Sequence, residues 1–331
     1  MTRRVQGLLL VSFALAGCSS DAVVAARPRV VVQSSAGIVA ADGQRIFRTI
    51  TKFPSNNPWG VVVRTDGIGL VTHPPLNVLS VIDAARQAIV GVISVNSCPS
   101  SIVLSPDGHT AYVGSSCLGQ IDVVDVDARR LVGFFSTGEV PNALAISSDG
   151  AHLYAGTASA NIQIINAQSG IVEATLPTGQ FGVVAGIALN SAGTLLYATL
   201  GQNVFEFDLL THFLLRTLVV GGNAEGPAIT AAQDHLIVAN DVGYFSDVIL
   251  ATGFLLNTPI PAGTFDALDV PLLNKALLTS PNGGTLVVYD ERRHLINQII
   301  PLGGSPRHLA VHEPSKTAVI TDAVGFIDFM R

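Results

Sequence analysis

A short motif recurs along this chain at a nearly constant interval, and it constrains the fold more than any other feature. The stretches LSPDGHTAYVG, ISSDGAHLYAG and LNSAGTLLYAT begin at Leu104, Ile146 and Leu189, which are 42 and then 43 residues apart. Each consists of an apolar run, a polar turn and a second apolar run, which is the pattern of a β-hairpin. Self-similarity at this interval predicts a repeat protein.

A second motif locates the rest of each unit. The segments SVID, DVVD, QIIN, FEFD and VVYD end at positions spaced by 42, 41, 42 and 82 residues, the last being two periods of 41. Apolar runs follow these segments, so one unit holds four short strands and no helical pattern. We expect seven units, which begin near Gly60, Ser101, Ala143, Val183, Pro227, Ala267 and His308.

Four strands within about 40–45 residues are typical of one blade of a β-propeller. A single four-stranded sheet cannot bury both of its apolar faces, whereas seven sheets packed around an axis can. Hydrophobic residues make up 48% of the chain and aromatic residues only 6%, which favours short strands rich in Val, Ile and Leu. The sequence therefore predicts an all-β fold, a seven-bladed β-propeller of four-stranded blades.

The way in which the ring closes is also predicted. The last unit, from His308 to Arg331, contains only three expected strands. We expect Gln44–Phe53, which precedes the first complete unit, to supply the missing outer strand of the last blade. The predicted propeller domain spans residues 30–331.

The repeat resembles the YVTN-type β-propeller repeat. The second and third units show a turn of SPDG type, a YVTN-like strand, a V-x-V-I-D strand and a G-x-x-P segment. The match is uneven, because the fourth unit has Ala192 in place of the turn aspartate and the fifth and sixth units are degenerate. The resemblance implies the propeller fold but no single activity, since related propellers include lactonases, lyases and surface-layer proteins.

Residues 1–17 have the pattern of a lipoprotein signal peptide. A basic start precedes the apolar run Leu8–Ala16, which is too short for the ~20 residues that span a bilayer. The sequence LAGC resembles the bacterial lipobox, so we predict that Cys18 is lipidated and that residues 18–29 form a tether. Ser19 resembles an outer-membrane sorting signal. We expect an exported protein, anchored in the outer membrane and facing the periplasm; the alternative is an ordinary cleavable signal.

The other two cysteines are predicted to form a disulfide. In the second unit the turn centres on Asp107-Gly108, so paired positions across the hairpin sum to 215 and Cys98 lies opposite Cys117. Opposed positions of this kind suit disulfide geometry, and an exported protein folds in an oxidising compartment. The alternative is a pair of buried free thiols.

Candidate ligand-binding residues lie where the first strands of the units begin. In a propeller these positions surround one mouth of the central channel, and they include Trp59, Asn142, Asp266, Arg307 and His308. Four of them, all but Asn142, belong to units that become neighbours when the ring closes. An alternative is that Arg307 pairs with Asp266 and that Trp59 packs against a loop. No metal-ligating residues are predicted, because no set of donors has suitable spacing.

Two classes of function fit these observations. The first is a non-catalytic scaffold that binds an envelope protein, a glycan or a small ligand at the channel mouth, with no cofactor. The second is a metal-dependent enzyme of lactonase or lyase type, with Ca²⁺ as a possible metal. It would need a ring of carboxylates and histidine around the metal, for which the chain offers Asp266, His308 and either Glu225 or Glu139. The net charge of −6 argues against nucleic acid as a partner. We expect the protein to be a monomer that is attached to the membrane through its lipid anchor.

Overall fold

The computed structural model describes residues 31–33, 50–96 and 98–331. The predicted signal peptide at 1–17, the tether at 18–29 and the lipidation site at Cys18 lie outside the described residues. Within the described part of the chain, no helix has the length and apolar character needed to cross a membrane.

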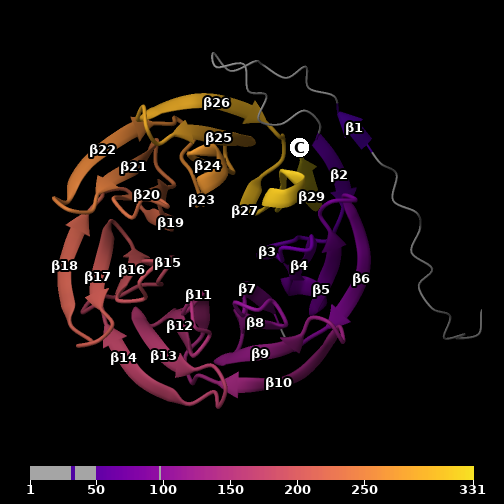
Figure 1. Cartoon of the computed structure of the whole chain (residues 1–331), viewed down its shortest axis with the longest axis horizontal. Coiled ribbons are helices and arrows are strands. Elements are labelled where there is room, and N and C mark those ends of the chain that lie inside the picture. The colour runs from indigo at the N-terminus through magenta and orange to yellow at the C-terminus, as the bar shows by residue number, and fades with distance from the viewer. Residues whose placement is uncertain (1–30, 34–49, 97) are drawn as a thin grey trace, which may run out of the picture.

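Seven antiparallel sheets stand in a ring around a central axis (Figure 1). This confirms the all-β, seven-bladed propeller. Six sheets hold four consecutive strands each, from an inner strand beside the axis to an outer strand at the rim. Their strands are β3 (Val61–Val63), β4 (Ile68–His73), β5 (Val78–Asp83), β6 (Ala88–Ser94); β7 (Pro99–Leu104), β8 (Thr110–Ser115), β9 (Gln120–Asp125), β10 (Arg130–Ser136); β11 (Pro141–Ile146), β12 (His152–Thr157), β13 (Asn161–Asn166), β14 (Val172–Pro177); β15 (Gly186–Leu189), β16 (Leu195–Leu200), β17 (Asn203–Asp208), β18 (Leu214–Val219); β19 (Ala224–Ile229), β20 (His235–Asn240), β21 (Tyr244–Ile249), β22 (Phe254–Pro259); β23 (Asp266–Val270), β24 (Lys275–Ser280), β25 (Thr285–Asp290) and β26 (Leu295–Pro301).

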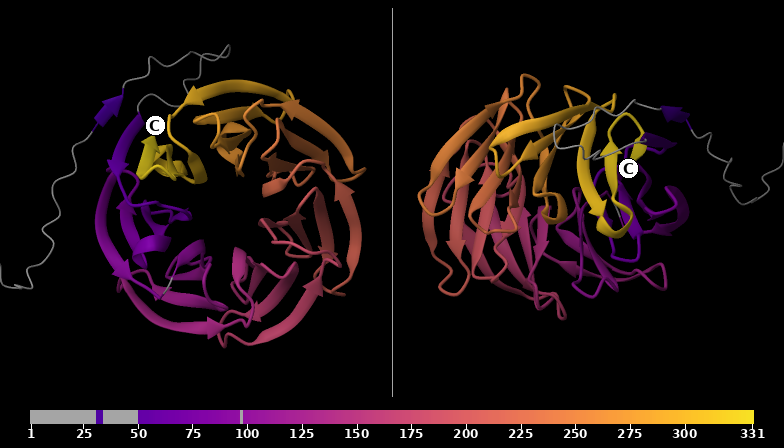
Figure 2. Two further views of the ribbon diagram at one scale, coloured as in Figure 1. Left: turned by 180° about the vertical axis from the view of Figure 1, so that it is seen from behind. Right: turned by 45° about the horizontal axis from the view of Figure 1, so that its top comes forward.

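The seventh sheet closes the ring with both ends of the described chain. Its inner strands are β27 (Pro306–His312), β28 (Thr317–Asp322) and β29 (Phe326–Met330), and β2 (Ile50–Pro54) pairs with β29 as the fourth. The predicted exchange of an N-terminal strand is therefore confirmed for the described part of Gln44–Phe53. An unpredicted short strand, β1 (Val31–Gln33), pairs with β2 and makes this sheet five-stranded (Figure 2).

Short helical turns are the remaining regular elements of the described residues. They are the 3₁₀ helices η1 (Pro74–Leu76), η2 (Pro271–Leu273) and η3 (Glu313–Ser315). The observed blades begin within three residues of the predicted starts, as a comparison of the inner strands shows. The repeat period therefore placed every blade correctly.

The core lies between neighbouring blades. One cluster joins the sixth and seventh blades through Leu277, Leu286, Leu309 and Ile320, all buried. The outer strands alternate instead, as in β10, where exposed and half-buried positions follow one another. The second and third strands of a blade are covered on both faces and the outer strands on one, which explains why the apolar runs differ between them.

The turn aspartates have the structural role that their repetition predicts. Asp107 Oδ1 accepts hydrogen bonds from the Ser105 hydroxyl and the His109 backbone N–H, at 2.5 and 3.0 Å. In the fourth blade, where Ala192 replaces the aspartate, Asn190 Oδ1 accepts from the Thr194 N–H at 2.8 Å instead. An Asx side chain that bonds the nearby backbone stabilises the turn from either position.

A disulfide joins Cys98 and Cys117, with their Cα atoms 5.7 Å apart. The pairs predicted from the same hairpin geometry are also present, since Leu104 lies opposite Ala111 and Ile102 opposite Val113. The disulfide links the open end of the β7–β8 hairpin, next to the point where the two strands stop pairing.

Candidate channel-mouth site

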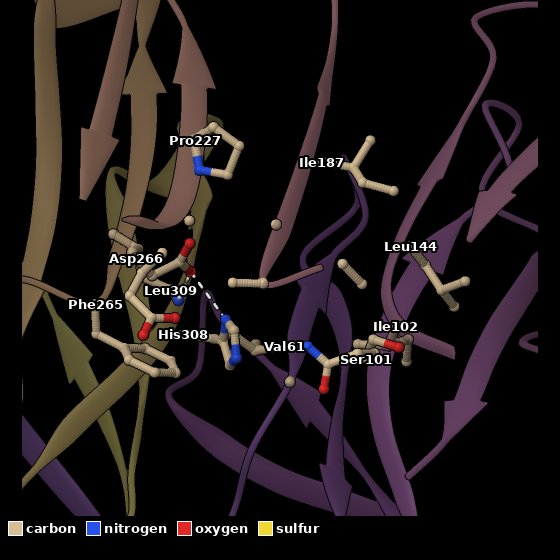
Figure 3. Close-up of a pocket in the computed structure, with 17 residues that line it drawn as sticks. Val61, Ser101, Ile102, Leu144, Ile187, Pro227, Phe265, Asp266, His308 and Leu309 are labelled. Atoms are coloured by element: carbon tan, nitrogen blue, oxygen red, sulfur yellow. Dashed lines mark hydrogen bonds and ion pairs between the residues drawn. The ribbon is translucent and has the colours of Figure 1, made fainter. Parts of the chain in front are cut away.

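A small cavity lies on the axis, at the end where the inner strands begin. Its volume is about 190 Å³, and residues of all seven blades line it. Figure 3 shows Asp266, His308 and Phe265 on one side, and Leu144, Ile187 and Ile102 on the other. The cavity is smaller than the ~300–1,000 Å³ typical of sites that enclose a whole drug-sized ligand. It has room for a small group only.

Threonine side chains hold the mouth residues in place. Thr321 Oγ1 donates to the Trp59 carbonyl at 2.5 Å across the ring closure, and it accepts from the His308 N–H at 3.0 Å. The same strand position carries a threonine in the first, fourth and sixth blades, and each hydroxyl donates to the backbone of the next blade. These donors are Thr72, Thr199 and Thr279, which bond Ser100, Glu225 and Arg307 respectively.

Several inner strands contain a β-bulge immediately after they begin. The pairing register shifts between Pro306 and Leu309 in β27, and similar shifts occur in β7, β11 and β19. A bulge leaves its residues out of the regular alternation and redirects their side chains. The residues placed in this way include Asn142, Glu225, Arg307 and His308.

Aromatic rings surround the guanidinium of Arg307. Its central carbon lies 5.4 Å from the Trp59 ring centroid and 4.7 Å from that of Phe265, both within cation–π range. The His308 ring packs edge-on against the same two rings, at 5.7 and 5.2 Å between centroids. Arg307 Nε is buried and has no hydrogen-bond partner among the described residues. The guanidinium is thus held by ring contacts, with donor capacity left over.

Asp266 pairs with His308, and not with Arg307. Its Oδ2 lies 3.1 Å from His308 Nδ1 and accepts from the Leu309 N–H at 3.3 Å, while Oδ1 accepts from the Ala267 N–H at 3.0 Å. The alternative in which Arg307 neutralises Asp266 is therefore wrong. The bulge in β27 directs His308 to the carboxylate, and the aromatic rings hold Arg307 beside it.

Four of the five predicted residues thus come together in a mouth cluster, defined as Trp59, Phe265, Asp266, Arg307 and His308. Phe265, Asp266 and His308 of this cluster line the cavity, whereas Trp59 and Arg307 lie beside these residues and are not part of its lining. Asn142 lines the cavity but does not join the cluster. Its side-chain amide donates to the Val184 carbonyl at 3.0 Å, so it serves the contact between the third and fourth blades.

Glu225 is the mouth residue that the sequence located least well. The fifth blade begins three residues before the predicted Pro227, because the bulge between Ala224 and Pro227 hides the start of β19. Burial raises the pKa of Glu225 to about 7, with the Asp241 carboxylate as the next cause, while His308 and Arg307 act in the opposite direction. A carboxyl group with this pKa exchanges its proton near neutral pH.

Close approach of the fifth and sixth blades requires a glycine beside Glu225. A Cβ atom on Gly226 would lie 2.2 Å from Asp266 Oδ1, so any side chain there would displace the carboxylate from His308.

The carboxylates of the mouth do not form a metal-ligating group. Among the residues described, the donors that gather in a group of three or more are those of His235, Asp247 and His294, at the other end of the strands. Sequence analysis missed this trio because its members come from two blades and share no spacing motif. The one available signal was Asp247, which interrupts the apolar pattern of its strand.

Comparison with known proteins supports the fold. No family model matches the sequence, and a search of curated proteins finds no relative. The structure is similar to that of hydrazine synthase from Kuenenia stuttgartiensis, with a TM-score of 0.75 and 14% sequence identity over 84% of this chain and 96% of that chain. At this identity the similarity concerns the propeller fold alone. Membership of the YVTN-type family stays a prediction.

Proposed function

We propose that this protein is a binding scaffold whose ligand site is the channel mouth. The observation that carries the proposal is Arg307, whose guanidinium is held between Trp59 and Phe265 with a buried Nε that has no partner among the described residues. A buried polar group without a partner costs about 1–3 kcal/mol, so a ligand that reaches Nε when the neighbouring side chains move would recover up to that amount.

The chemistry of the mouth cluster favours a sugar acid or the end of an acidic glycan. Arginine binds carboxylates with two parallel hydrogen bonds, and the half-buried rings of Trp59 and Phe265 offer an apolar surface to a sugar ring. Asp266 and Glu225 can accept hydrogen bonds from hydroxyl groups. The cavity volume of about 190 Å³ limits the inserted part to one such unit.

The proposal places the protein in the bacterial envelope, attached through a lipid on Cys18. The support is the sequence LAGC after an apolar run that is too short to span a bilayer. A scaffold held there would meet acidic glycans and envelope proteins, and we propose these as its partners.

Trp59 provides the direct test, because it is the only tryptophan in the chain. Titration with D-glucuronate should change its fluorescence in a saturable way, and neutral D-glucose should bind more weakly. Arg307→Met should abolish the change, whereas Arg130→Met, an exposed arginine in the second blade, should leave it intact. No saturable change with either sugar, or an equal response in both variants, would reject this site.

An enzymatic role is the second candidate, and the pKa of about 7 for Glu225 favours it. A buried carboxyl group near His308 and Asp266 could transfer a proton at neutral pH, as hydrolysis or elimination of a lactone or uronate requires. Loss of turnover in Glu225→Gln, with retained binding by fluorescence, would support this role. Absence of turnover on lactone and uronate substrates would exclude it.

A further inference from the structure

A second polar cluster lies at the opposite end of the blades from the channel mouth. It consists of His235 at the start of β20, Asp247 in β21 and His294 in the turn between β25 and β26. The first two belong to the fifth blade and the third to the sixth blade, which are neighbours in the ring (Figure 1). One nitrogen or oxygen from each residue lies within 4.8 Å of the others.

Asp247 is at the centre of this histidine–aspartate cluster. Its Oδ1 lies 2.5 Å from His235 Nδ1, and its Oδ2 lies 2.9 Å from His294 Nδ1. The hydroxyl of Tyr289, itself fully buried, donates to Oδ2 at 2.7 Å. Asp247 is 1% exposed, so this carboxylate is shielded from water and oriented from three sides.

The repeat does not require a carboxylate at this position. Each blade pairs the third residue of its second strand with one residue of its third strand, and that residue is apolar in five blades. The equivalents are Val81, Val123, Ile164, Val288 and Phe329, whereas the fourth blade has Glu206, which is paired with Arg216. Burying a carboxylate in place of an apolar side chain costs several kcal/mol unless it is compensated. The cost indicates a specific role for Asp247.

We propose that His235, Asp247 and His294 form a binding site for a divalent transition metal ion, of which Zn²⁺ is the best match. Two imidazole nitrogens and one carboxylate oxygen suit Zn²⁺ and its neighbours in the first transition row, whereas Ca²⁺ and Mg²⁺ prefer oxygen alone.

The geometry is close to that which Zn²⁺ requires. Bonds of ~2.0–2.1 Å in a tetrahedral arrangement separate the ligand atoms by ~3.3 Å, so shifts on the order of 1 Å in the side chains suffice. The ion takes the place of the protons that now join the imidazoles to Asp247. The Tyr289 hydroxyl stays on the carboxylate and orients it, as is usual for metal-binding carboxylates.

The site is also accessible to a cation. The side chains of His235 and His294 are 17% and 39% exposed, which leaves a path from solvent to their nitrogens.

The test is calorimetric titration of the untagged full chain with ZnCl₂, after removal of metal by a chelator. We expect one Zn²⁺ per chain, a visible absorption band with Co²⁺, and no competition by Ca²⁺. His294→Asn should weaken Zn²⁺ binding by about tenfold or more. Asparagine tolerates the positive φ of 53° at this turn position, so the variant should fold.

The matched control is His212→Asn, at the same turn position of the fourth blade with φ of 63°. It should bind Zn²⁺ as the parent protein does. Absence of Zn²⁺ binding, equal binding in the two histidine variants, or displacement of Zn²⁺ by equimolar Ca²⁺ would overturn the proposal. Asp247→Asn, with its melting temperature recorded, gives a second test on the central ligand.

Discussion

Lys52 Nζ lies 2.9 and 2.8 Å from the two carboxylate oxygens of Asp328, which joins residues that are 276 positions apart in the chain. Lys52 is in β2 and Asp328 is in β29, so this ion pair spans the seam at which the propeller closes. Both Asp328 and its neighbour Asp322 are fully buried, and Lys52 also lies 3.9 Å from Asp322. One lysine therefore compensates two carboxyl groups in the core of the last blade.

Lys52→Met should destabilise the protein by about 3–5 kcal/mol at pH 8, because it leaves buried carboxylates without a cation. Burial already raises the pKa of Asp328 to about 6, and loss of Lys52 would raise it further. The cost should therefore shrink at pH 5, where Asp328 is protonated. Urea unfolding at both pH values measures this, with the exposed Lys316→Met as control. An equal cost at both pH values would contradict the role of the ion pair.

Thr321→Val should cost about 1–2 kcal/mol, since it removes the hydrogen bond to the Trp59 carbonyl across the closure and the one accepted from the His308 N–H within the blade. It should also shift the emission maximum of Trp59, because the backbone that carries the indole loses its anchor. Thr199→Val is the matched control, as it removes the equivalent bond from the fourth blade to the Glu225 carbonyl of the fifth blade. The control should lose similar stability without a change in emission; a shift in both variants would indicate general loosening.

Reduction of the Cys98–Cys117 disulfide should lower the free energy of unfolding by about 3 kcal/mol. The estimate comes from the chain entropy released when a loop with a sequence separation of 19 residues is opened. Melting temperatures with and without dithiothreitol measure the effect, and Cys98→Ser/Cys117→Ser should melt like the reduced protein. If dithiothreitol lowers the melting temperature of this double variant as well, the loss arises elsewhere.

Glu225→Gln should change how stability depends on pH. The pKa of Glu225 is about 7 in the folded protein and near 4.5 when unfolded, so the folded state holds the extra proton between these values. The contribution of Glu225 is therefore complete below pH 4.5 and is lost as the pH rises towards 7. Its slope cannot exceed about 1.4 kcal/mol per pH unit.

Relative to the parent protein, Glu225→Gln should accordingly gain stability between pH 5 and pH 8. Chemical unfolding across this range gives the difference directly. Parallel curves for the two proteins would mean that Glu225 is ionised throughout. Asn223→Ala, which removes the amide that donates to Glu225 Oε1 at 2.8 Å, should raise the pKa of Glu225 and extend the decline to higher pH.

The sequence by itself determined the architecture, because a blade is built from local interactions. Strand alternation and turn residues such as Asp107 act within one unit, and the unit recurs every 41–43 residues. The well-matched units are numerous enough to locate the degenerate ones between them. The disulfide was predictable for the same reason, since Cys98 and Cys117 lie across a single hairpin. The N-terminal strand of the last blade was predictable because the last unit of the sequence contains only three expected strands.

Only the tertiary structure decided which side chains meet. Trp59, Arg307 and Asp266 come from different blades, and their contacts depend on ring closure and on bulges that one strand pattern does not reveal. Because of a bulge, the fifth blade begins before Glu225 and not at the predicted Pro227, and the bulge in β27 gives Asp266 His308 as its partner in place of Arg307. His235, Asp247 and His294 likewise meet only because the fifth and sixth blades pack together. Contacts within a blade follow the spacing along the chain, whereas contacts between blades follow from packing, which the spacing does not encode.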